Sequence, residues 1–117
     1  MKNHTEVEKI PAKYPVDLIP IYGGSRVTYG GKNERDKTML ILQFYSREDK
    51  VQVLNFYKRV LKNAENKEDS VLEMKRGILY SLAGVLNDYQ ASFVISDVNI
   101  EDFKCAVLIN LQVGILE

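Results

Sequence analysis

The chain has 117 residues, 45% of them hydrophobic, and its 16 basic and 16 acidic residues give a formal net charge of zero. This size is suited to one domain with one core, and zero net charge argues against a nucleic-acid-binding surface spread over the whole molecule. Its apolar runs are far too short to span a bilayer, so we expect a single domain that binds no nucleic acid and has no transmembrane segment.

The N-terminal stretch lacks the features of a secretion signal. Residues 1–20 are interrupted by charged side chains and have no apolar core of the kind that signal peptides contain. The chain as it stands is therefore expected in the cytoplasm, whereas removal of a signal before Met1 would make it an exported or membrane-anchored protein. Because residues 1–15 lack periodicity, we predict a flexible arm there and a single α+β domain over residues 16–117.

A glycine-rich region brackets the first predicted strand. Gly23 and Gly24 favour a turn, and the β-prone residues 26–29 are expected to form the strand. Residues 30–37 mix glycine, asparagine and alternating charges, which predicts a loop. Residues 38–45 then place apolar side chains on both faces, which predicts a central strand that is covered on both sides.

The hydrophobic spacing changes from strand-like to helix-like after this strand. Ser46 and Asp49 have the spacing of a capping box, which predicts the start of a helix. Apolar residues then recur along one helical face, and we predict a helix over Arg47 to Ala64. The polar residues 63–69 are expected to form the loop that ends it.

The second half of the chain has the pattern of a strand meander. If Asn87 and Asp88 form a two-residue turn, the apolar residues of 78–86 and 89–96 share one face, and small or polar residues share the other. The last strand, residues 104–113, alternates apolar and polar residues and is expected to be long and central. The pairs predicted across the hairpin are Leu86 with Tyr89, Gly84 with Ala91, Leu82 with Phe93, and Tyr80 with Ile95.

Residues 70–87 are also compatible with a second helix. Ser70 and Glu73 have capping-box spacing, and apolar residues follow them at helical intervals. Gly77 and Gly84 are costly inside a helix, however, and the β-rich sequence that follows favours the hairpin. We therefore predict an α+β fold with an antiparallel sheet of about five strands and one amphipathic helix packed on one face.

The glycine-rich segment is the one stretch that suggests a ligand site. It ends in Gly31-Lys32, as a phosphate-binding loop does, but Arg26 stands where such a loop has its first glycine. A strand rather than a helix is expected to follow it, so two turns around a short strand are the simpler interpretation. The weak ligand-binding candidates are Tyr22, Ser25, Arg26, Gly30, Gly31 and Lys32.

The sequence offers no convergent set of catalytic or metal-ligating residues. Segment 97–102 begins like a calcium loop but lacks the required glycine and the final carboxylate. His4 is the only histidine and Cys105 the only cysteine, so neither a zinc site nor an internal disulfide is predicted. Cys105 lies on the apolar face of the last strand, where we expect it to be buried. We predict no cofactor, no metal and no enzyme activity.

The order of these elements resembles that of small bacterial exported domains, often lipoproteins, of uncharacterised function. The resemblance rests on the turn at residues 19–25, on Phe44-Tyr45-Ser46, on the helix segment 55–61 and on the strands from Tyr80 to Ile95. It implies export and brings no catalytic residues with it.

The sequence thus favours a non-catalytic module that binds an unknown small ligand or a protein partner. One alternative is a regulatory domain that binds GTP or ATP through the glycine-rich loop. Another is a structural subunit that forms a homodimer through a sheet edge or through the mixed strand face. Leu79, Val85 and Val94 motivate the homodimer, because they would otherwise be left in water.

Overall fold

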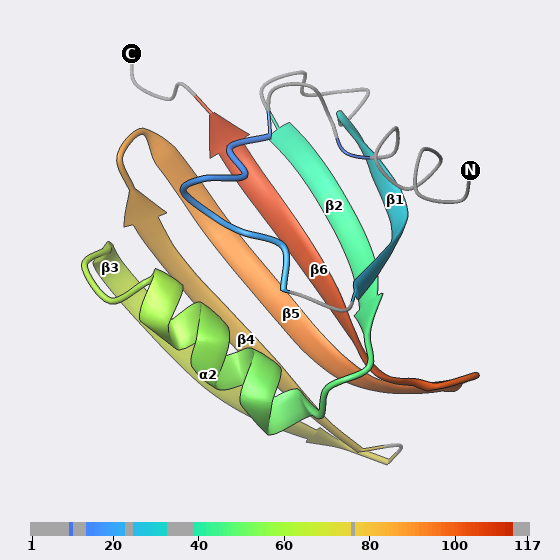
Figure 1. The fold of residues 1–117 in the computed structure, drawn as a ribbon. Helices are drawn as coiled ribbons and strands as arrows, with labels where there is room; N and C mark the ends of the chain where they lie inside the picture. Colours follow the sequence, from blue (N-terminus) through green and yellow to red (C-terminus); the bar gives the residue numbers. More distant parts are fainter. Residues whose placement is uncertain (1–9, 11–13, 23–24, 33–38, 76, 114–117) are drawn as a thin grey trace.

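The computed structural model describes residues 10, 14–22, 25–32, 39–75 and 77–113. The strands form one antiparallel sheet in the order β1-β2-β6-β5-β4-β3, and a single described helix, α2, connects β2 to the edge strand β3 (Figure 1). The described chain is therefore an α+β fold. Its elements are β1 (Ser25–Lys32), β2 (Met39–Ser46), α2 (Lys50–Val60), β3 (Glu65–Met74), β4 (Gly77–Leu86), β5 (Tyr89–Ile100) and β6 (Phe103–Val113).

The hairpin of β4 and β5 has the register that the sequence predicts. Its pairs are Leu86 with Tyr89, Gly84 with Ala91, Leu82 with Phe93, and Tyr80 with Ile95. Asn87 has a positive φ of 53°, as a tight two-residue hairpin turn requires. Residues 77–86 form a strand, so the alternative of a second helix over residues 70–87 is wrong.

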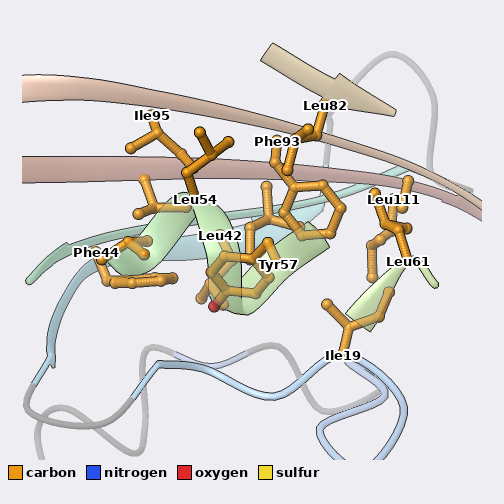
Figure 2. Packing of buried hydrophobic residues seen from close by; sticks show 14 of the residues in the cluster. Ile19, Leu42, Phe44, Leu54, Tyr57, Leu61, Leu82, Phe93, Ile95 and Leu111 are labelled. Carbon is orange, nitrogen blue, oxygen red and sulfur yellow. The ribbon is translucent and has the colours of Figure 1, made fainter. Parts of the chain in front are cut away.

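The two faces of the sheet differ in what covers them. On one face, α2 and the segment 14–22 pack over the strands, and this layer holds the core (Figures 1 and 2). On the other face, side chains such as Val85 and Val94 are half-buried, and no described element lies over them. Residues of β2 alternate between buried and half-exposed, so the predicted cover on both sides of this strand is wrong.

The sheet has six described strands rather than about five, because β3 was expected to be a loop. Its ten residues, Glu65–Met74, are all exposed and pair only with β4 among the described strands. An edge strand that buries no side chain has no hydrophobic alternation, so the usual sequence signal is missing. β1 also extends beyond its predicted end, since Gly30 and Gly31 pair with Leu42 and Ile41 of β2.

The helix is shorter than predicted at both ends. Asp49, not Ser46, is the N-cap, and its side chain accepts a hydrogen bond from the backbone N–H of Gln52 at 3.1 Å. Ser46 is instead the buried last residue of β2, and its hydroxyl accepts from the N–H of Glu48 at 3.1 Å. The helix ends at Val60 with Leu61 as its C-cap, and the N–H of Lys62 then donates to the carbonyl of Arg59 at 3.0 Å in a tighter turn.

Tyr57 of α2 is the centre of the core. Its ring is fully buried and stacks on Phe93, with the ring centroids 4.9 Å apart (Figure 2). Its hydroxyl donates to the carbonyl of Pro20 at 2.8 Å and accepts from the N–H of Tyr22 at 3.1 Å. Burial raises the pKa of Tyr57 well above the usual tyrosine value, so the hydroxyl keeps the proton that it donates.

The same residue therefore connects the segment 14–22 to the helix. Ile19 of this segment is fully buried, and Tyr14 is 5% exposed and donates its hydroxyl to the carbonyl of Ile19 at 2.9 Å. Most of the predicted flexible arm, residues 1–9 and 11–13, lies outside the described residues. The domain boundary after residue 15 stays a prediction.

We expect Tyr57→Phe to lower the free energy of unfolding by about 1–3 kcal/mol, because it leaves the Pro20 carbonyl and the Tyr22 N–H without their partner. Chemical denaturation measures this loss. The matched control is Tyr89→Phe, at a half-buried tyrosine whose hydroxyl makes no hydrogen bond with the described residues, and it should change stability by less than about 0.5 kcal/mol. Equal losses in the two variants would contradict the role given to the Tyr57 hydroxyl.

Candidate functional site

The predicted ligand-binding residues do not converge on a cradle for phosphate. Ser25 and Lys32 lie at opposite ends of the eight-residue strand β1, and Gly30 and Gly31 lie within its ladder with β2. Tyr22 lies outside the strand, with its ring edge against Phe56 of α2 at a centroid distance of 4.9 Å. This extended geometry does not supply the loop and helix N-terminus that hold a nucleotide phosphate. Nucleotide binding by these residues stays a prediction.

Arg26, the remaining candidate, belongs to a cluster around the ring of Phe103. Its guanidinium lies 5.6 Å from the ring centroid, and that of Arg47 lies 4.7 Å from it. Arg26 also forms a 3.6 Å ion pair with Glu101. Because Phe103 is only 3% exposed, the two arginines cover an apolar ring at the end of the sheet, and the cluster has a structural explanation.

Lys50, in the first turn of α2, forms a largely enclosed ion pair with Asp97. Its ammonium donates to Asp97 at 2.6 Å and to the carbonyl of Ile78 at 2.8 Å, and its side chain is 14% exposed. Gly77 lies beside this pair, and a Cβ there would lie 2.7 Å from a carboxylate oxygen of Asp97. The contacts join the start of α2 to β4 and β5, so their role is to position the helix.

Cys105 is buried as predicted, and its surroundings suppress its reactivity. Its side chain is fully buried, and its thiol donates to the carbonyl of Glu48 at 3.4 Å. Burial, followed by the nearby charges of Asp97 and Asp49, raises the pKa of this thiol to about 11. The thiol is therefore protonated at neutral pH and is not an activated nucleophile. Among the described residues, no group of three or more acidic, histidine or cysteine side chains could hold a metal ion.

The uncovered face of the sheet has a shallow hollow of about 340 Å³. Two cross-strand pairs, Gln90 with Gln112 and Ser92 with Asn110, form part of its floor, and Ala83 of β4 lies beside them. Amide and hydroxyl groups can exchange hydrogen bonds with a polar ligand or with water. The carboxylate of Glu68 also lines the hollow, so a charged group lies beside these polar side chains.

Among the described residues, the edge strand β3 has the most exposed large apolar side chains. Val71, Leu72 and Met74 of this strand are 61%, 56% and 55% exposed, and Ile78 at the start of β4 is 37% exposed. Large apolar side chains on an unpaired strand edge favour pairing with another chain, and soluble proteins normally block such edges. The charged residues of β3 lie mainly in its first half, so the second half remains apolar.

These side chains project on both faces of the sheet. Val71 pairs with Tyr80, whose face carries the core, whereas Leu72 pairs with Leu79 on the uncovered face. The flank of α2 that faces β3 contributes Val51, which is 52% exposed and lies two helical turns before Lys58. Lys58 lines a hollow between α2 and the edge together with Lys67 of β3. We call Val51, Val71, Leu72, Met74 and Ile78 the β3 edge surface.

Sequence reasoning missed this surface because it treated residues 63–76 as a loop or as the start of a helix. The signal that was present is the run Val71-Leu72 followed by Met74, three large apolar residues in an otherwise charged segment. Whether such a run is buried or exposed depends on its place in the sheet, which the local sequence does not encode.

We expect Cys105 to be alkylated at least about a hundredfold more slowly in the native protein than in denaturant at pH 8, because the free thiol of an unfolded chain has a pKa of about 8.5 and the native thiol is both buried and protonated. Iodoacetamide labelling followed by intact-mass measurement gives both rates. A native rate equal to the denatured rate would show that the thiol is accessible and would contradict this burial.

Within the described part of the chain, no helix is long and apolar enough to cross a membrane. Comparisons of the whole chain with family models, curated proteins and solved structures gave no match. Function is therefore inferred from the geometry and chemistry of the surface.

Proposed function

We propose that this chain is a non-catalytic interaction module that binds a protein partner at the β3 edge surface. The observation that carries the proposal is the strand β3 itself, a ten-residue edge on which Val71, Leu72 and Met74 are each more than half exposed. Outside the β3 edge surface, Val16 and Ile100 are the large apolar side chains of the described residues that are exposed. Both are distant from this strand in sequence.

The mode of binding that fits this surface is strand addition. A partner strand laid along β3 would satisfy the outward backbone N–H and C=O groups of the edge and continue the sheet. Its side chains would alternate between the two faces, where Val71 and Val51 offer apolar contacts on one side and Leu72 on the other. Backbone pairing supplies affinity in this mode, and the apolar contacts supply specificity.

The chemistry of the buried groups supports a role without catalysis. Burial raises the pKa of Cys105 to about 11 and raises that of Tyr57 and Tyr14 above the usual tyrosine range. These groups remain protonated at neutral pH, and the hydroxyls of both tyrosines are engaged with backbone carbonyls. Export, as the resemblance to small lipoprotein-type domains implies, stays a proposal.

An array of ten-residue extended peptides of varied sequence tests this proposal. The protein is applied at a concentration at which light scattering shows one chain per particle. We expect the wild type to bind a subset of peptides, and we expect the double substitution Val71→Lys with Leu72→Lys to abolish that binding. Both side chains are more than half exposed, so the two lysines leave the core intact and act by placing charge on the edge.

The matched control is Val16→Lys, an apolar-to-lysine change at a 45% exposed position outside the sheet, which should retain the wild-type peptide set. Binding of no peptide by the wild type, or the same peptide set for the double variant, would overturn the assignment of the β3 edge. Turnover of esters, phosphates or glycosides by the purified protein would overturn the non-catalytic part of the proposal.

A further inference from the structure

We infer that the partner at the β3 edge surface is a second copy of this chain, with the two β3 strands paired antiparallel about a two-fold axis at Ser70. This inference rests on the proposed function and names the occupant of the same edge. A two-fold axis makes the interface self-complementary, because if residue i of one copy contacts residue j of the other, residue j of the first also contacts residue i of the second.

The charges of β3 select this register. With the axis at Ser70, Lys67 lies opposite Glu73 of the second copy, because each is three residues from the axis. Glu65 lies beyond a register shift between Glu65 and Glu68, and Lys75 lies in the turn after β3, so this axis does not align those two residues. The Lys67–Glu73 pair occurs twice in a symmetric dimer. Opposite charges that face one another across two strands stabilise the pairing, and like charges destabilise it.

Neighbouring registers lose this complementarity. With the axis at Val71, Asp69 faces Glu73, which repels, and the Lys67–Glu73 pair is lost. With the axis at Asp69, Lys67 faces Val71 instead of Glu73, so the pair is lost there too. The positions of Lys67 and Glu73 therefore favour one alignment of two identical edges over the alignments one residue away.

The side chains of Lys67 and Glu73 lie on the same face of the sheet, as directly opposed residues of antiparallel strands must. Glu73 is paired with Ile78 and lies two residues from Val71, whose partner is Tyr80 on the covered face. Lys67 reaches that face too, since its ammonium donates at 3.1 Å to the carbonyl of Lys62, in the turn that follows α2. An ammonium has three donors, so this exposed hydrogen bond leaves capacity for Glu73 of a second copy.

The same two-fold axis also fixes where the exposed apolar residues of the edge lie relative to the second copy. With the axis at Ser70, Val71 lies opposite Asp69 and next to the small serine pair at the centre. Two copies of Val71 therefore lie diagonally across the axis, with Val51 of each helix on the same face. Leu72 faces Glu68 on the other side of the sheet. The exposed apolar positions of the edge would then lose water on both faces.

Charge reversal tests the inference, with sedimentation velocity as the readout. We expect the wild type to sediment as a species of twice the 13.4 kDa chain mass. Lys67→Glu places glutamate opposite Glu73 at both ends of the interface, and Glu73→Lys places lysine opposite Lys67. Each single variant should weaken dimerisation by roughly tenfold or more. An equimolar mixture of the two variants places opposite charges at both positions and should restore the dimer.

The double variant Lys67→Glu with Glu73→Lys should also dimerise with itself, because its two charges are exchanged in both copies. Lys104→Glu, the same charge change at an exposed position of β6, is the matched control and should leave dimerisation unchanged. Rescue by mixing separates pairing from a fold defect, since a damaged fold would not be repaired by a second variant. Circular dichroism of each single variant shows independently whether its fold is intact.

A monomeric wild type at high concentration, or a dimer that the charge reversals leave intact, would overturn this inference. If the wild type is monomeric yet binds peptides that the Val71→Lys with Leu72→Lys variant does not bind, the proposed function holds and the partner is another protein. If that double variant dimerises as the wild type does, the edge is not the dimer interface and the inference fails, while the peptide array still decides the proposed site.

Discussion

The rest of the structure depends on one packing interaction, that of Tyr57 and its helix against a single face of the sheet. Tyr57 buries its ring on Phe93 and directs its hydroxyl to Pro20 and Tyr22, so one residue joins the helix, the sheet and the N-terminal segment. A buried hydroxyl with both a donor and an acceptor partner stabilises one arrangement of these layers over others. With this face closed, the remaining surface of the sheet is open to other contacts.

The position of α2 also explains why β3 is exposed. The helix packs on β4 and β5, and Lys50 holds its first turn beside Asp97 and Ile78. The chain then leaves the helix at Val60 and enters the sheet as its edge strand, next to β4. A strand in this place contributes backbone pairing to β4 but little to the core, so its side chains are available for another chain.

Two properties of β3 have opposite effects on its tendency to pair with another strand. Its apolar half favours association, whereas its charges oppose uncontrolled pairing with arbitrary strands. The charges do not repel in every arrangement, because Lys67 and Glu73 are equally distant from Ser70. In the proposed dimer, such a distribution would favour the register centred on Ser70 over misaligned ones.

The sequence by itself determined the β4–β5 register and the amphipathic face of α2, because alternation and helical spacing are local and apolar residues have few ways to share a face. It also placed Cys105 correctly in the core. Only the tertiary structure decided that Glu65–Met74 is an edge strand, that Asp49 rather than Ser46 caps the helix, and that Gly30 and Gly31 lie in a ladder instead of a loop. Each of these depends on which strand lies alongside, and strand neighbours are set by contacts distant in sequence, which local propensity does not encode.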